Sequence, residues 1–448
     1  PILEFNRLLG IKESEFLSQT QATFKLGIQF VNWGGVGEQY FHPFGNYGYA
    51  VDGVSFHQIW RALKEQGNNQ PLETYSPAAM SAAAGKFMIT GPDHRADLPP
   101  INYAYQFDAS LYAAFLRKYA EARGVRRIEG IVRTAHQDPA SGNIASVEMK
   151  DGAKIEGDLF VDCSGFRGLL IEQTLQSGYE TWTHWLPCDR AVAMPCEKAG
   201  AALPFTRSTA HRSGWQWRIP LQHRTGNGNV YCSAFMTDEE AVGHLRSNLD
   251  AQPTAEPNFL KFTTGRRRKF WNKNVVAIGL SSGFMEPLES TSIHLIQTAI
   301  SKLVALLSSG TWTEKQAEAF NRLTGKEYQR IRDFLILHYK ATRRNDSPFW
   351  DYCRNMEIPD TLAEKIELYR CNGQVFREED ELFMETSWVA VFEGQGIHPH
   401  TVNPMAHSFD MKELSSEVSE VERSIKWMVE HMPTHEDFIK RYCPAQIN

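Results

Sequence analysis

Apolar positions follow two different spacings along the chain, and the spacing changes near residue 310. Upstream of that point the apolar residues gather in short runs typical of strands, at 24–33, 144–149, 158–162 and 274–279. Downstream of Trp312 the chain becomes more charged, and its apolar residues recur at helical spacing over 314–343, 361–369 and 411–442. The pattern predicts a mixed α/β module over residues 1–310 and a mostly helical module over residues 311–448.

Within the α/β module the same spacing and the flanking cap residues predict three helices. They run from Phe56 to Gly67, from a cap at Asp108 to a point before Gly124, and from Ser292 to Gly310. The apolar run 158–162 ends in a loop at Gly165, which is typical of a buried parallel strand. Residues 215–222 and 230–235 predict a hairpin around the turn 225–229, and most of 41–102 predicts loops.

Composition excludes several classes of protein. A length of 448 residues with 42% hydrophobic and 22% charged residues is ordinary for a soluble globular protein. The net charge of −6, without a run of Lys or Arg, argues against nucleic acid as a partner. No apolar stretch approaches the ~18–20 residues of a membrane span, so we expect no membrane partner. The odd number and scatter of the cysteines make a reduced cytoplasm the expected location.

Metal chemistry is also not indicated. The seven cysteines are scattered and never form a Cys-x-x-Cys pair, which predicts neither a disulfide framework nor a zinc site. His398 and His400 flank a proline without supporting ligands at metal-binding spacing, so a loop is the better interpretation.

Residues 279–293 are the segment most informative about chemistry. A buried strand leads into a loop that holds Gly279, Gly283 and Pro287, and the loop ends at a predicted helix start at Ser290–Ser292. Helix starts leave backbone N–H groups unpaired and carry partial positive charge, so this one is a candidate site for an anion. The alternative is a helix that Ser or Thr caps by itself.

Two charged residues are candidate catalytic groups. Lys25 lies within the apolar strand run, and a lysine that faces the interior there is costly unless it has a function or a partner. Glu289 is its candidate partner, or a base for a proton on an aromatic ring. Strand alternation that turns Lys25 to solvent is the alternative, and Glu289 then merely complements the helix dipole.

The segment Trp215-Gln-Trp217-Arg-Ile219-Pro220 places two indole rings on one face of a predicted strand. Such a pair belongs either to a core or to a wall that faces a ligand.

Several of these segments, in this order, resemble the flavin-dependent halogenases of the tryptophan halogenase type. The resemblance rests on Trp215, Trp217, Ile219 and Pro220, on 24–33 with Lys25 in the place of the catalytic lysine, and on 279–291 with Glu289 in the place of the catalytic glutamate. The segments 42–46 and 347–350 are similar to family segments as well.

The resemblance implies an FADH2-dependent halogenase, with a flavin-monooxygenase-like FAD-binding box in the α/β module and a helical region that covers the substrate. Reduced FAD from a separate flavin reductase forms a C4a-hydroperoxide with oxygen, and chloride or bromide held at Thr291 and Ser292 becomes hypohalous acid. Lys25 guides this oxidant to the substrate, and Glu289 helps to remove the ring proton. Val132, Leu280 and Ile293 match flavin-lining positions, and His42, Phe44 and Trp388 lie in the substrate region. The Trp pair keeps substrate away from flavin.

Three departures from the family pattern modify these expectations. A dinucleotide-binding unit takes roughly 30 residues, whereas 24 residues precede Lys25 and lack its glycine pattern, so we expect an N-terminally incomplete chain. Ser292 stands where relatives commonly have Gly. Paired tyrosines that clamp free tryptophan are not evident near Phe383, which favours an indole-like aromatic substrate. An ordinary flavin monooxygenase and a flavin-less remnant that binds aromatics remain alternatives, and a homodimer is kept as an option.

Overall fold

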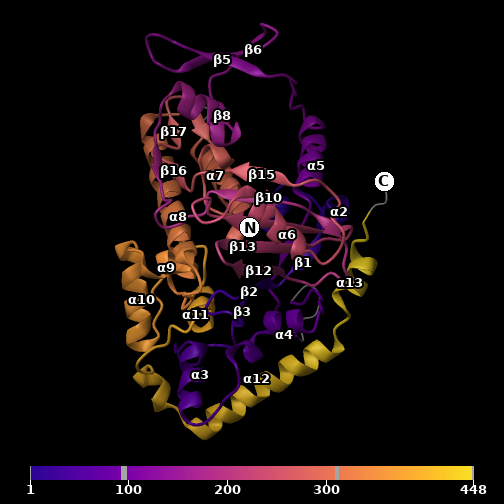
Figure 1. The fold of residues 1–448 in the computed structure, drawn as a ribbon, viewed down its shortest axis with the longest axis vertical. Helices are drawn as coiled ribbons and strands as arrows, with labels where there is room; N and C mark the ends of the chain where they lie inside the picture. The colour runs from indigo at the N-terminus through magenta and orange to yellow at the C-terminus, as the bar shows by residue number, and fades with distance from the viewer. Residues whose placement is uncertain (1, 92–97, 308–311, 446–448) are drawn as a thin grey trace. The chain divides into compact units, whose positions relative to one another are not determined.

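The computed structural model describes residues 2–91, 98–307 and 312–445 (Figure 1). The chain divides into two compact units, each built from separate stretches. The first unit takes Pro1–Leu8, Ala114–Asp189 and Lys261–Arg332, and the second takes Leu9–Ala113, Arg190–Leu260 and Asp333–Asn448. The predicted modules 1–310 and 311–448 were drawn from composition, and that division stays a prediction.

The first unit contains three small sheets. Strand β8 (Phe160–Asp162) runs parallel to β18 (Val275–Ala277), which confirms a parallel strand here, and β17 (Trp271–Asn272) pairs with β18. The predicted burial of this strand is wrong, because Val161 at its centre is exposed. The other two sheets are β5 (Val132–Gln137), β6 (Ile144–Met149) and β7 (Lys154–Glu156), and β19 (Gly283–Phe284), β16 (Gly265–Arg267) and β9 (Tyr179–Thr181). Ile144, Ile171 and Val275 belong to the core that joins the first two sheets. The helices of this unit are α1 (Ile2–Leu8), α7 (Ser292–Leu306) and most of α8 (Glu314–Lys340).

An eight-stranded sheet forms the centre of the second unit. Its order is β15 (Asn258–Lys261), β10 (Arg190–Ala193), β14 (Arg224–Tyr231), β13 (Gly214–Pro220), β12 (Thr206–His211), β2 (Gly27–Val31) and β3 (Gln39–Pro43), with β11 (Cys196–Glu197) paired to β14. A separate pair joins β1 (Thr23–Lys25) to β4 (Ala104–Gln106).

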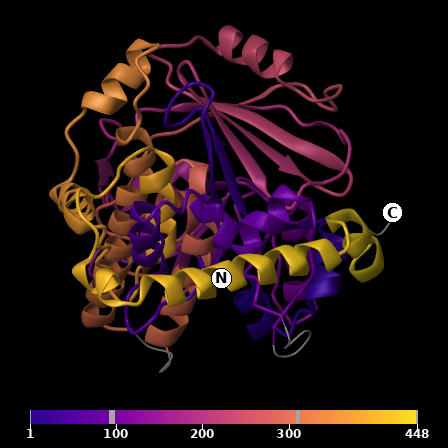
Figure 2. The same ribbon diagram turned by 90° about the horizontal axis from the view of Figure 1, so that it is seen from below.

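Helices of the second unit come from all three of its stretches. They are α2 (Glu13–Gln19), α3 (Phe56–Glu65), α4 (Pro77–Ala83), α6 (Asp238–Ser247), α9 (Pro348–Asn355), α10 (Asp360–Asn372), α11 (Glu385–Gly394), α12 (Met411–His431) and α13 (His435–Tyr442). Helix α5 (Ala109–Glu121) begins here and continues into the first unit; Asp108 caps its first amides, as predicted. The long yellow helix in Figure 2 is α12, which packs against α4.

Three of the predicted segments are wrong in detail. The single strand over 24–33 is two strands, because the backbone of Leu26 bonds to Pro204 and Phe44 between them, so β1 and β2 enter different sheets. The hairpin turn lies at 221–223 and not at 225–229, since Gly226 and Gly228 belong to β14 and pair with β13. Within 41–102, β3 and α4 replace part of the predicted loop. Residues 92–97 and the predicted helix end at Gly310 lie outside the described residues.

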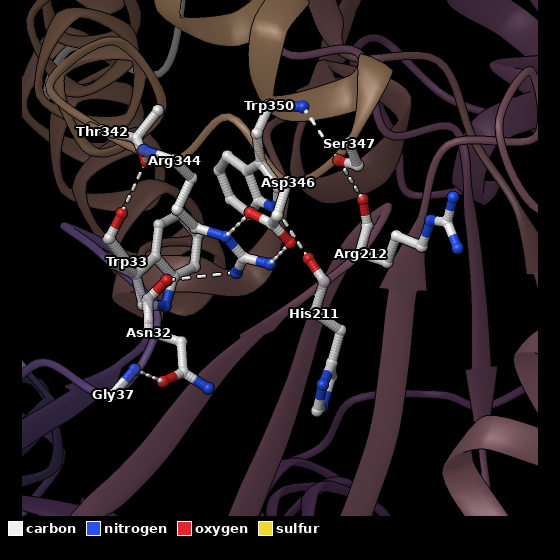
Figure 3. Close-up of polar contacts among 10 residues, drawn as sticks. All are labelled: Asn32, Trp33, Gly37, His211, Arg212, Thr342, Arg344, Asp346, Ser347 and Trp350. Carbon is white, nitrogen blue, oxygen red and sulfur yellow. Dashed lines mark hydrogen bonds and ion pairs between the residues drawn. The ribbon is translucent and has the colours of Figure 1, made fainter.

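Residues 342–350, which follow α8, bind to the central sheet through side chains that donate hydrogen bonds to backbone carbonyls (Figure 3). Thr342 Oγ1 donates to Trp33 O at 2.7 Å, and Trp350 Nε1 donates to His211 O at 2.6 Å. Arg344 forms a two-pronged pair with Asp346 and also donates to the backbone of Asn32. These bonds fix the helical part of the unit to the ends of β2 and β12.

Candidate functional site

Lys25 is buried, with 4% of its surface exposed, at the end of β1. Its Nζ lies 5.4 Å from the centroid of the Phe44 ring. An ammonium group held over an aromatic face in a desolvated place gains electrostatic stabilisation from the ring. The prediction that Lys25 faces the interior is therefore confirmed, and the solvent-facing alternative is wrong.

An aromatic cluster extends from Phe44 through the interior of the second unit. The ring of His42 lies 6.2 Å from Phe44 and 5.7 Å from Phe334, centroid to centroid. Phe383 stacks on Phe334 at 3.8 Å, and Trp388 meets Phe334 edge-on at 4.9 Å. We call Lys25, His42, Phe44, Phe334, Phe383 and Trp388 the Lys25 cluster. It unites the predicted catalytic lysine with all three residues predicted for the substrate region.

Phe334 was missed by the sequence analysis. The available signal was its position in α8, one helical turn before His338, whose ring lies 5.1 Å away. That spacing is also typical of an ordinary buried helix face, so it did not distinguish a ligand wall from a core.

Trp388 carries a polar group suited to a ligand. Its side chain is 1% exposed, and within the described parts of the chain its indole N–H has no hydrogen-bond acceptor. Lys365 Nζ lies 5.0 Å from the centroid of the Trp388 ring. Because a buried donor without an acceptor is costly, this N–H favours a ligand that brings an acceptor.

In the first unit, the loop between β18 and α7 is tightly shaped. Gly279 has a φ of +79°, and a Cβ on Gly283 would lie 2.6 Å from the carbonyl oxygen of Gly265, so both positions require glycine. Ser290 adopts a left-handed φ of +58° just before the helix, a conformation that is unfavourable for a residue with a side chain. Strain at this point fixes the direction in which the chain enters α7.

The start of α7 is the segment for which the sequence predicts an anion site, and that site stays a prediction. Thr291 is 2% exposed, occupies the N-cap position, and makes no side-chain cap bond to any described residue. The alternative in which this threonine caps its own helix is therefore wrong. Helix starts leave their first backbone N–H groups without partners inside the helix, and both Ser292 and Ile293 at this start are partly buried.

Glu289 ends the short 3-10 turn Pro287–Glu289 that precedes this helix start, and it is 8% exposed. Leu280 belongs to the turn Gly279–Ser281, which contacts α7. Val132, by contrast, lies half-buried in the β5–β6–β7 sheet, paired with Met149. Lys25 belongs to the second unit and Glu289 to the first.

A charged cluster on α7 was not anticipated. Glu327 of α8 accepts from Thr298 Oγ1 at 3.0 Å, pairs with His294 Nε2 at 3.0 Å, and also binds Lys302. Burial raises the pKa of Glu327, but the bond from His294 and the charge of Lys302 bring the pKa below its usual value. The spacing of four residues from His294 to Thr298 to Lys302 was the signal, and it places all three on one helix face.

Trp215 and Trp217 lie on one face of β13, as predicted, with ring centroids 6.2 Å apart. Trp215 is fully buried and Trp217 is half-buried. Opposite Trp217 in the register is Gly228, where an added Cβ would lie 2.0 Å from the indole ring. Farther along the strand, Ile219 pairs with Gly226 and Pro220 with Thr225.

His398 takes part in an ion cluster. Its Nδ1 lies 3.0 Å from Glu393 Oε2, and the same carboxylate binds Arg61 and Tyr369.

Residues 2–22 hold α1 and α2 and contain no glycine-rich turn from a strand into a helix. No described helix is both long and apolar enough to cross a membrane.

Comparison with known proteins gives consistent matches. The family model described as tryptophan halogenase matches residues 1–411. Tryptophan 7-halogenase RebH of Lentzea aerocolonigenes is 32% identical over 479 residues, which cover 98% of this chain and 88% of the relative. Two solved flavin-dependent halogenases are each 43% identical. Xcc4156 from Xanthomonas campestris has a TM-score of 0.97 with 100% of this chain and 89% of that chain covered, and BrvH from Brevundimonas sp. BAL3 has 0.95 with 99% and 90% covered. These matches confirm the predicted α/β fold class with its C-terminal helical region.

Proposed function

Because this chain belongs to the tryptophan halogenase family, whose matched members are flavin-dependent halogenases, we propose that it halogenates an indole-like, electron-rich aromatic substrate with reduced FAD, O2 and chloride or bromide. Membership of the family makes the protein an enzyme of the oxidoreductase class. The observation that carries the proposal is the buried Lys25 amine, which lies against Phe44 in an otherwise aromatic cluster.

The start of α7 fits the ring end of a flavin. Uncapped backbone N–H groups at this helix start suit a flavin carbonyl or a halide, and Leu280, Ile293 and Val132 are the residues we assign to the flavin. Reduced FAD, when bound, supplies with O2 the oxidising equivalent that converts halide to hypohalous acid. Thr291 and Ser292 would hold the halide through the backbone at the same helix start.

Lys25 is proposed to aim the oxidant. Its ammonium group donates a hydrogen bond to hypohalous acid and turns the halogen toward the substrate ring. When a ring carbon takes the halogen, the oxygen leaves as water with a proton from Lys25, and Glu289 accepts the proton that the ring carbon loses. The product is the halogenated ring, and proton exchange with water restores both side chains.

The aromatic substrate is proposed to bind within the Lys25 cluster. Flat rings are favoured partners for Phe334, Phe383 and Trp388, because offset and edge-on ring contacts add to the burial of apolar area. RebH is named for tryptophan. We propose an indole-like substrate here because Leu382 and Phe383 stand in the region of the paired tyrosines. A separate flavin reductase, a cytoplasmic location and a homodimer complete the proposal.

The test is a reaction with chemically reduced FAD, oxygen and indole, run with chloride and with bromide and analysed by mass spectrometry. We expect a product that carries the isotope pattern of the halide supplied. Hydroxylated indole formed equally without halide would contradict halogenation and favour an ordinary monooxygenase. Absence of a bound flavin spectrum with added FAD would favour the flavin-less remnant.

Lys64 offers a matched control for the lysine. Its exposed Nζ lies 4.9 Å from the centroid of the Trp60 ring, so it is also a lysine over an aromatic face. We expect Lys25→Ala to lose halogenated product while flavin reoxidation continues, and Lys64→Ala to keep both. Equal product from Lys25→Ala and the unmodified enzyme would contradict the role of Lys25.

A further inference from the structure

A cavity lies in the second unit, against β12, β13 and β14. It has a volume of about 330 Å³, within the range of small-molecule sites. Residues on β13 alternate between its two faces, so Arg218 and Pro220, which line this cavity, lie on the face opposite Trp215, Trp217 and Ile219. The cavity is therefore distinct from the strand face that carries the indole pair.

Two arginines meet at this cavity in an unfavourable arrangement. Arg207 and Arg218 lie directly opposite each other on the antiparallel strands β12 and β13, and both line the cavity. Like charges in that relation destabilise a sheet. Burial and the charge of Arg218 both lower the pKa of Arg207, which reflects the same repulsion.

The positive charges of the two arginines are balanced differently. Arg218 pairs with Asp250 at 2.8 Å and donates to the Asn248 carbonyl at 2.9 Å. Arg207 donates from Nε to the neutral side chain of Gln29 at 2.8 Å, and within the described ranges this is its one hydrogen bond. The terminal nitrogens of Arg207 therefore make no hydrogen bond to any described residue. The Asp250 carboxylate partly offsets the lowered pKa of Arg207, but it is bonded to Arg218.

The remaining lining residues are mostly apolar, and the exceptions are Thr225 and the carboxylate of Asp250. Leu203, Phe205 and Pro220 line the cavity beside the arginines, and the Phe205 ring is fixed edge-on against Phe41 at 5.7 Å. A guanidinium group binds a carboxylate through two parallel N–H bonds, and an apolar wall binds the body of the same molecule. We propose that this cavity binds a small organic carboxylate with an apolar body, whose carboxylate group pairs with Arg207.

This proposal is independent of halogenation, so its test uses neither flavin nor halide turnover. Benzoate is the probe, with binding measured by calorimetry and thermal stability measured with and without the probe. We expect saturable benzoate binding that raises the melting temperature. Arg207→Gln should weaken benzoate binding at least about tenfold, whereas Arg246→Gln, an exposed arginine of α6 outside the cavity, should leave it unchanged.

The ligand-free stability of Arg207→Gln separates a binding role from a structural one. Because the substitution removes one of two facing charges, we expect the ligand-free variant to melt at a higher temperature than the unmodified protein. A lower melting temperature, with benzoate binding retained, would overturn the proposal. Asp250→Asn provides a second variant, and we expect tighter benzoate binding because one competing carboxylate is removed.

Inorganic phosphate and acetate distinguish the chemistry of the ligand. Phosphate tests charge without an apolar body, and acetate tests a carboxylate with one methyl group. We expect both to bind at least about tenfold more weakly than benzoate, because neither reaches the wall of Leu203, Phe205 and Pro220. Equal binding of all three anions would overturn the assignment of an apolar carboxylate.

Discussion

Gly228 offers a sharp test of how the indole pair on β13 is held. It lies opposite Trp217 in the register, and a Cβ there would lie 2.0 Å from the indole Cζ2. Ordinary contact begins near 3.4 Å, so Gly228→Ala requires the ring to retreat by about 1.4 Å. Overpacking of this kind costs about 1–3 kcal/mol of unfolding free energy.

Gly226 is the matched control on the same strand. Its added Cβ would meet its nearest neighbours, Arg224 and Ile219, at 3.6 Å, which is ordinary contact. Gly226→Ala should therefore be neutral or should stabilise by up to about 1 kcal/mol, since alanine loses less backbone entropy on folding. Urea unfolding of both variants measures the difference.

A double-mutant cycle identifies Trp217 as the cause. In a Trp217→Ala background the space over Gly228 is empty, and Gly228→Ala should then behave like Gly226→Ala. A loss of 1–3 kcal/mol that persists without the indole would refute the packing argument, as would equal stability of the two alanine variants with Trp217 in place. If Trp217 separates substrate from flavin, Gly228→Ala should also lower halogenated product per flavin oxidised.

Three further predictions concern pH, the cluster on α7 and the halide. Burial lowers the pKa of His435 to about 4, and the neutral ring accepts from Phe24 N at 3.1 Å and donates to Ala202 O at 2.7 Å. Below pH 6.5 the His435 ring binds a proton in the unfolded chain but not in the folded protein. The free energy of unfolding should therefore fall by about 3 kcal/mol from pH 6.5 to pH 4. His435→Gln should make stability, measured by urea titration, less dependent on pH over this range. The pKa of Glu327 is lowered in the folded protein, so its contribution to the free energy of unfolding is present above the usual carboxyl pKa and is lost as the pH falls through the folded value. Glu327→Gln should therefore reduce stability at pH 7 more than at pH 3. An equal loss at both pH values would argue against the charge pairs. Ser292→Gly should retain turnover and change the ratio of chlorinated to brominated product in a mixed-halide assay, whereas an unchanged ratio would remove the Ser292 position from halide selection.

The sequence pattern predicted correctly the helix starts that depend on residues only a few positions apart. The helix start after Asp108 follows from side-chain bonds to nearby amides, and the start of α7 at Ser292 follows from the local spacing of apolar residues; both are confirmed. The break at Leu26 could not be predicted, because its partners Pro204 and Phe44 are distant or follow after a turn. The placement of Gly226 and Gly228 in a strand likewise depends on Ile219 and Trp217, which they face on β13, and no local rule for turns contains those contacts.

In the candidate site as well, residues that stand out from their neighbours in sequence could be predicted, whereas residues placed by distant parts of the chain could not. Lys25 stood out because an amine inside an apolar run conflicts with its surroundings, and burial at 4% exposure keeps that conflict in the folded protein. Phe334 creates no such conflict, since a phenylalanine on a buried helix face agrees with every local rule; its place in the Lys25 cluster depends on His42, Phe383 and Trp388, which come from other parts of the chain. The facing pair Arg207 and Arg218 is a third case. Each arginine is ordinary within its own strand, and the two repel each other only because the register of β12 and β13 places them opposite each other. Residues in conflict with their local sequence can thus be found without a structure, while conflicts between strands require the pairing to be known.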